Sequence, residues 1–141
     1  MIHVSAAAGR KLIAAAKAKR PSKYRAQKTE IDGVIFDSKK EARRWLELCS
    51  MARAGHITLL ERQVKYPLVI DGAPVIIRSR RVNKDGGERK GRQAMYTADF
   101  RYFLVNGNRM VVEDAKGFLT PDAVLRVALV EAIYRIRVDF V

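Results

Sequence analysis

The sequence has few of the side chains that form disulfides or transition-metal sites. Cys49 is the only cysteine in 141 residues, so no internal disulfide can form and a reducing compartment suits the chain. The two histidines, His3 and His56, are far apart, and neither has neighbours at metal-ligand spacing. No run approaches the roughly 18 apolar residues that a membrane-spanning helix requires. These absences argue against a disulfide scaffold, a histidine or cysteine metal site and a membrane protein.

Acidic residues are absent from positions 1–28 and scarce at positions 78–92. The first segment carries eight Lys or Arg, and the second carries seven against two acids, so together they account for the whole net charge of +13. Charge gathered in this way favours a polyanionic partner, above all the nucleic-acid backbone, with an anionic membrane surface as the competing interpretation. The cations expected to contact phosphates are Lys17, Lys19, Arg20, Lys23 and Arg25 in the first segment and Arg78, Arg80, Arg81, Lys84, Arg89, Lys90 and Arg92 in the second.

Residues 1–28 are rich in alanine and predict a basic arm, with the ordered domain beginning near Thr29. Basic residues interrupt the small apolar stretches of this arm and none precedes them, so it does not resemble a secretory signal. Ser38 is a natural N-cap for a first helix that Gly55 closes, and Thr120 is the N-cap of a second. The β-prone runs predict strands at 57–70, 75–77, 96–105, 108–117 and 135–141, with a turn at 71–74 and a loop at 83–91. This order predicts a single α/β domain over 29–141, in which helices pack on a mixed sheet.

Asn106-Gly107 lies between two apolar, β-prone runs, which is the strongest short-range signal for a hairpin with a type I′ turn. With a two-residue loop, the numbers of paired residues sum to 213, and Asp99 faces Asp114 across the strands. Lys116 follows two positions after Asp114 and therefore projects from the same face. Like charges at this distance destabilise a hairpin, whereas two carboxylates and an ammonium suit a divalent metal held beside a phosphate.

Glu113 is a second acid beside Asp114, and it complicates the choice. Strict alternation places Glu113 on the other face of the hairpin, so it would replace Asp114 only if a bulge shifted the register by one residue. A two-residue loop favours Asp114. Taken singly, Asp99, Asp114 and Lys116 could also be solvated charges that form surface ion pairs.

Glu41 in the first predicted helix has a structural interpretation of its own. The run Ser38-Lys39-Lys40-Glu41 fits a capping box, in which the glutamate side chain bonds back to the amide of the N-cap. The residues alone favour that role. Gln63 is interpreted as an ordinary polar residue of the long strand, and Arg126 as an exposed helical cation.

Several of these segments resemble a known nuclease superfamily. Tyr-Thr-Ala-Asp-Phe at 96–100, the Asn-Gly turn and Val-Glu-Asp-Ala-Lys-Gly at 112–117 resemble the core of the PD-(D/E)XK nucleases, whose fold is αβββαβ. The stretch from 23–25 through 36–44 is similar to a phage-borne family of small predicted endonucleases in that superfamily. The hairpin also resembles that of the phage junction-resolving endonucleases. The resemblance covers residues 23–141.

The resemblance implies a role for each acid. Asp99 and Asp114 fall on the metal-binding acids of the motif, Lys116 falls on its lysine, and Glu41 falls on a helix glutamate that serves as a further metal ligand or positions water. A capping role and a metal role compete for the Glu41 side chain.

Together these features predict a Mg²⁺-dependent DNA endonuclease, in which Mn²⁺ can replace Mg²⁺. The resemblance further implies a branched substrate such as a Holliday junction or flap, a homodimer, and a phage or prophage protein that acts in recombination or replication in the bacterial cytoplasm. Two alternatives stay open. One is a non-catalytic basic DNA-binding module, and the other is a nuclease that acts on linear DNA ends or on RNA.

Overall fold

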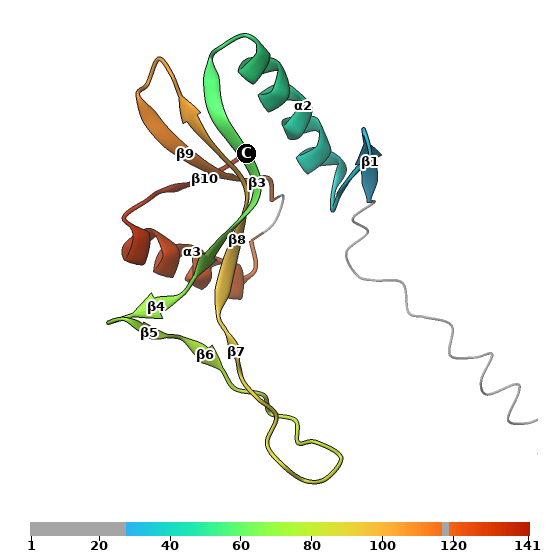
Figure 1. Cartoon of the computed structure of the whole chain (residues 1–141), viewed down its shortest axis with the longest axis vertical. Coiled ribbons are helices and arrows are strands. Elements are labelled where there is room, and N and C mark those ends of the chain that lie inside the picture. The colour runs from blue at the N-terminus through green and yellow to red at the C-terminus, as the bar shows by residue number, and fades with distance from the viewer. Residues whose placement is uncertain (1–27, 117–118) are drawn as a thin grey trace, which may run out of the picture.

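A mixed four-stranded sheet lies between two helices in the computed structural model, which describes residues 28–116 and 119–141 (Figure 1). Only the last residue of the predicted basic arm, residues 1–28, falls within this described part. The strands lie in the order β10-β9-β8-β3, with β9 and β10 parallel and the other pairs antiparallel. The main elements are α2 (Lys39–Arg53), β3 (Ile57–Pro67), β8 (Met95–Leu104), β9 (Arg109–Asp114), α3 (Pro121–Tyr134) and β10 (Val138–Phe140).

These elements follow the predicted αβββαβ order, and the predicted α/β class is confirmed. Ser38 is the N-cap of α2 and Thr120 the N-cap of α3; each side-chain oxygen accepts a hydrogen bond from an amide of the first turn. Gly55 has a φ of +76° just after α2, a conformation that glycine adopts without steric cost. Neither described helix is long and apolar enough to cross a membrane.

The two helices cover opposite faces of the sheet. Leu48 of α2 packs in one apolar cluster with Phe100 and Val111, whereas Val127 of α3 packs in another with Val112. Val111 and Val112 are consecutive on β9, and consecutive strand residues point to opposite faces. The end of β9, with its acidic pair, is therefore enclosed by a helical layer on each side.

The predicted register of the central hairpin is confirmed. Strands β8 and β9 pair from Leu104–Arg109 to Phe100–Glu113, and every pair of numbers sums to 213. Continuing the register by one pair places Asp99 opposite Asp114.

The predicted turn type of this hairpin is wrong. A type I′ turn needs positive φ at both Asn106 and Gly107, but the positive φ, +44°, occurs at Asn108 instead. The amide of Asn108 donates to the carbonyl of Val105 at 3.2 Å, so the loop has four residues, 105–108. Two-residue and four-residue loops centred on the same point impose the same register, which explains why the predicted pairing holds.

Paired positive φ angles of the type I′ kind occur at two Asp-Gly turns instead. Asp32-Gly33, with φ angles of +50° and +76°, joins β1 (Thr29–Ile31) to β2 (Val34–Phe36), a hairpin that the sequence did not lead us to predict. Asp71-Gly72, with +49° and +77°, joins β4 (Val69–Ile70) to β5 (Ala73–Pro74) in the turn predicted at 71–74.

Beyond β5 the chain leaves the sheet as a two-stranded projection (Figure 1). Strands β6 (Ile76–Ile77) and β7 (Arg92–Gln93) pair antiparallel, and residues 78–91 form the loop between them. We call residues 76–93 the β-ribbon. At its base, the amide of Ala94 donates to the carbonyl of Val75, and the amide of Leu68 donates to the carbonyl of Ala94. These bonds join the β-ribbon to the sheet, while residues 78–91 are all exposed.

Candidate active site

Polar side chains from four elements converge where β8 meets the end of β9. Glu41 comes from α2, Gln63 from β3, Asp99 from β8 and Asp114 from β9, and Lys116 lies two residues after the end of β9. Hydrogen bonds link Glu41 to Gln63, Gln63 to Asp99, and Asp114 to Lys116. The structure therefore brings together all four predicted catalytic residues and adds one to which the sequence assigned no role.

Asp99 is held by two hydrogen bonds and has a perturbed acidity. Its Oδ1 accepts from the Gln63 amide at 3.2 Å and its Oδ2 accepts from the Ala115 backbone amide at 2.8 Å. The pKa of Asp99 is raised to about 7, and burial is the largest cause. The adjacent Asp114 is the next cause, because a protonated Asp99 would share its proton with that carboxylate. The negative charge of Glu41 raises the pKa further. The site thus gathers more negative charge than it neutralises.

Asp114 is fully buried, and only one of its oxygens is satisfied. Its Oδ2 accepts from the Tyr96 hydroxyl at 2.6 Å and from Lys116 Nζ at 2.9 Å. Burial, and then the Asp114 carboxylate, raises the pKa of Tyr96, so the phenol stays a donor. While Asp99 is ionised, no donor reaches the buried Oδ1 of Asp114 from the described residues. Such an oxygen is costly to bury unless a cation or a proton meets it.

Glu41 divides its two oxygens between a capping role and the site. Ser38 Oγ accepts from the Glu41 amide at 3.1 Å, as a capping box requires. The reciprocal bond differs, because Glu41 Oε2 accepts from the amide of Asp37 rather than that of Ser38. Glu41 Oε1 accepts from the Gln63 amide at 3.1 Å. One oxygen of this buried carboxylate thus serves the helix cap, and the other contacts Gln63 of the cluster.

Gln63 is the site residue that sequence reasoning missed. Its Nε2 donates to both Glu41 and Asp99, so one amide bridges two carboxylates that would otherwise repel each other. Its φ of +51° is unusual for a residue with a side chain in the middle of a strand. Unusual backbone of this kind is found where a structure holds a side chain in a fixed place. The only available sequence signal is a polar residue inside a β-prone run.

Glu113 points away from the cluster, as the alternation of β9 predicts. Arg44 of α2 binds it through two nitrogens, at 2.9 and 2.7 Å, and the Tyr102 hydroxyl donates to it as well. The hydrogen bond to Glu113 raises the pKa of Arg44, while burial followed by that carboxylate raises the pKa of Tyr102 to about 12. Glu113 is thus a partner that ties α2 to β9, and Asp114 is the acid that faces Asp99.

A hollow of about 360 Å³ opens beside Lys116. Tyr96 and Thr97 of β8 and the first turns of α3 line it, and Arg126 adds a second cation that is ion-paired to Asp122 at 3.1 Å. The hollow could take a phosphate next to the two aspartates. An apolar hollow of about 500 Å³ between α3 and β10 lies apart from these groups and offers no comparable chemistry.

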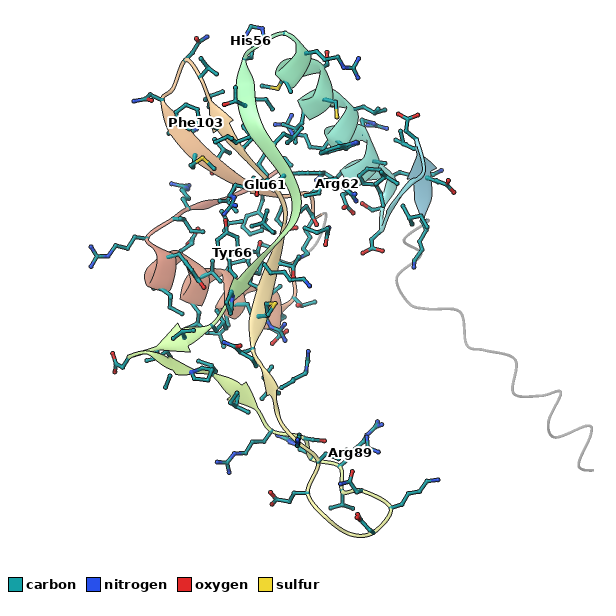
Figure 2. All side chains as sticks on the ribbon, viewed as in Figure 1. His56, Glu61, Arg62, Tyr66, Arg89 and Phe103 are labelled. Carbon is teal, nitrogen blue, oxygen red and sulfur yellow. The ribbon has the colours of Figure 1, made fainter. Side chains whose placement is uncertain are left out.

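The predicted phosphate-contacting cations separate into two sets. Those of the first segment, Lys17, Lys19, Arg20, Lys23 and Arg25, lie outside the described residues. All seven of the second segment lie on the β-ribbon, where each is exposed. Figure 2 shows Arg89 there, well away from Glu61 and Arg62 on β3.

The donor set suits Mg²⁺ in part. In the described ranges, 28–116 and 119–141, no three His, Cys, Asp or Glu side chains form a ready-made metal centre. Asp99 and Asp114 nevertheless offer facing carboxylates, and the unsatisfied Oδ1 of Asp114 is a buried oxygen that lacks a partner among these residues. Mg²⁺ commonly takes one or two carboxylates and keeps several waters, so this pair fits it. Glu41 contacts this pair only through the side-chain amide of Gln63, which lies between Glu41 and Asp99.

Comparison with known proteins defines the family. No curated protein and no solved structure matches the chain. A family model described as a protein of unknown function (DUF1064) matches residues 21–141, which include helices α2 and α3, the four-stranded sheet, the β-ribbon and all five converging side chains. The chain therefore belongs to the DUF1064 family.

Proposed function

We propose that the protein is a Mg²⁺-dependent DNA endonuclease that hydrolyses phosphodiester bonds. One observation carries the proposal. Asp99 faces Asp114 next to Lys116, and Asp114 keeps one buried oxygen without a donor from the described residues. A sheet gains nothing from two facing acids, and the arrangement is explained by a cation that neutralises them.

In the proposed mechanism, Asp99 and Asp114 hold the ion through carboxylate oxygens. When bound, Mg²⁺ supplies Lewis-acid polarisation of the phosphate and makes a nearby water more acidic. Lys116, whose Nζ lies 2.9 Å from Asp114 Oδ2, is placed to orient the attacking water or to stabilise negative charge that develops on the phosphate. The Gln63 amide fixes the orientation of the Asp99 carboxylate, and Glu41 in turn fixes that amide.

The substrate part of the proposal rests on charge and on resemblance. The exposed cations of the β-ribbon, together with those of residues 1–28, would contact phosphates outside the site and carry little sequence information. Branched DNA, such as a Holliday junction or flap, is the proposed substrate, and a homodimer that cuts two strands is the proposed assembly. The resemblance also suggests that the activity serves phage recombination or replication in the bacterial cytoplasm.

Replacing Asp99 by Ala tests the activity. The pure wild-type protein should cleave labelled DNA only when Mg²⁺ or Mn²⁺ is present, and the Asp99→Ala variant should lose this cleavage while keeping its fold. Asp139→Asn is the matched control, because Asp139 lies on β10 and its only ion pair within the described chain is with Arg137, at 3.8 Å. Cleavage that persists unchanged in Asp99→Ala would refute the catalytic assignment.

A non-catalytic DNA-binding module is the second candidate, and the exposed, cation-rich β-ribbon favours it. It predicts that the wild-type protein binds DNA but does not cleave any member of a panel of junction, flap, duplex, single-stranded and RNA substrates. The same panel separates a branched-DNA endonuclease from a nuclease that acts on linear ends or RNA.

A further inference from the structure

The β-ribbon contains a hollow lined by positive charge. Arg78 and Ser79 follow β6 on one side, and on the other side Arg89 and Lys90 precede β7, whose first residue is Arg92. With Ile77 they line a hollow of about 300 Å³. The sequence shows these cations as a scattered set, whereas the fold places four of them around one space.

The positive charge of this hollow is not neutralised within the described protein. None of the seven cations of the β-ribbon forms an ion pair with a described carboxylate. Asp85, one of the two acids in the loop, instead accepts a hydrogen bond from the amide of Gly87. Four cations that line one hollow without an acid repel each other, and an anion would relieve that repulsion.

Gly91 gives the hollow its shape. A Cβ at this position would lie 2.4 Å from Ile76 Cγ2 and 3.1 Å from the carbonyl oxygen of Ile77, so a side chain here would displace the Ile76 side chain and crowd the backbone of β6. A larger residue would push the segment before β7 away from β6, and the cations on both segments would move with it. The close approach is therefore part of how the charges are held.

We propose that this hollow binds a backbone phosphate of duplex DNA at a point away from the acidic cluster. A strand advances about 3.3 Å per residue, so the eight residues from 77 to 84 reach at most about 26 Å. B-DNA rises about 3.4 Å per base pair, so the β-ribbon covers up to about 7 base pairs of duplex. A duplex arm of up to this length beside the cleaved bond would therefore lie within reach of the β-ribbon. That last step rests on the proposed nuclease function, whereas the binding itself does not.

The experiment measures binding by fluorescence anisotropy with EDTA present, so that no cleavage occurs. The test variant replaces Arg78, Arg89, Lys90 and Arg92 by Gln. Its affinity for a labelled 20-base-pair duplex should fall at least about tenfold. The slope of log affinity against log salt should become shallower by about 0.9 for each phosphate that the variant no longer neutralises.

The matched control replaces Arg53, Arg109, Arg135 and Arg137 by Gln. It removes the same charge from exposed positions outside the β-ribbon, and its affinity should stay within about threefold of the wild type. An equal decrease in the test and control variants would overturn the inference, because net charge alone would then explain binding.

A second variant, Gly91→Val, keeps every charge and alters only the approach of the two strands. Its duplex affinity should fall about as far as that of the test variant, with the melting temperature of the protein unchanged. If Gly91→Val bound duplex DNA with wild-type affinity, the shape of the hollow would not matter for binding and the inference would be wrong.

Three further measurements test whether duplex DNA, rather than another anion, binds in the hollow. The decrease in affinity should be larger for duplexes of 20 base pairs than for duplexes of 6, and larger for duplex DNA than for single strands or duplex RNA. Equal decreases across these ligands, or displacement of DNA by inorganic phosphate at low millimolar concentration, would overturn the duplex-DNA assignment. A wild-type protein that binds through the β-ribbon but cleaves no substrate refutes the nuclease alone.

Discussion

The acidic cluster and the β-ribbon both bring like charges together, but they hold them in different ways. In the cluster, Asp114 is fully buried and Asp99 is fixed by hydrogen bonds to Gln63 and Ala115. In the β-ribbon, cations such as Arg78 and Arg89 are exposed and form no ion pair with the described residues. Hydrogen bonds and packing therefore fix the charged groups of the cluster themselves, whereas in the β-ribbon only the backbone positions the cations.

The difference suits the two tasks that we propose for these regions. Bond cleavage depends on groups held to a fraction of an ångström, and a site between two packed helical layers provides such positioning. Attraction to a polyanion depends on the number and reach of charges, and exposed side chains on a projecting ribbon provide it. We therefore expect changes in the cluster to affect turnover and stability, and changes in the β-ribbon to affect affinity and salt dependence.

Lys116→Ala should produce the largest effect. Removal of a donor that stabilises developing negative charge typically lowers kcat about 10²–10³-fold, and KM for DNA should change little because the β-ribbon is intact. Steady-state cleavage of a labelled junction or flap at fixed Mg²⁺ separates the two parameters. The four-cation β-ribbon variant should show the reverse pattern, with KM raised more than kcat is lowered. If Lys116→Ala raised KM alone, the proposed division of roles would be wrong.

Local sequence signals were sufficient for much of the fold. Ser38 and Thr120 predict the helix starts because capping depends on a few neighbouring residues. The pairing of Asp99 with Asp114 is also local, since one short loop sets it. The turn type was not predictable to the same degree, because loops of two and four residues yield the same pairing.

The role of Gln63 and the hollow of the β-ribbon could not be predicted from the sequence, because both depend on pairing between distant residues. Gln63 reaches Asp99 across β3 and β8, which are 36 residues apart at this point, and the register of those strands shifts at an irregularity between Thr58 and Glu61. No local pattern encodes such a register. The hollow of the β-ribbon has the same origin, because it needs Arg78 and Arg89 to meet across a hairpin.

Arg44→Met should have the next largest effect, on stability. Arg44 binds the buried Glu113 and also the exposed Glu47, at 2.8 Å. Removing one partner of a buried ion pair costs about 3–5 kcal/mol, and since the Arg44 side chain is 23% exposed we expect about 2 kcal/mol here. Urea unfolding followed by the fluorescence of Trp45 measures the decrease in the free energy of unfolding.

The control for Arg44→Met is Glu47→Gln, which removes only the exposed partner. A surface pair of this kind contributes about 0.5 kcal/mol or less. Equal destabilisation in the two variants would contradict the view that the buried Glu113, rather than charge on the surface of α2, ties the helix to the sheet.

The smallest expected effect compares one substitution in the two regions. Gln63→Glu replaces the bridging amide by a third carboxylate between Glu41 and Asp99, so repulsion should lower the free energy of unfolding by about 1 kcal/mol and the melting temperature by about 3 °C without metal. Gln93→Glu places the same charge on β7 beside Arg92, where it should leave the melting temperature unchanged or raise it slightly. Addition of about 5 mM Mg²⁺ should bring the melting temperatures of the two variants closer together, because a cation at Asp99 and Asp114 offsets the added charge only in the cluster. The cluster would not be the cation site if the two variants changed the melting temperature equally. The same would follow if Mg²⁺ left the difference between their melting temperatures unchanged.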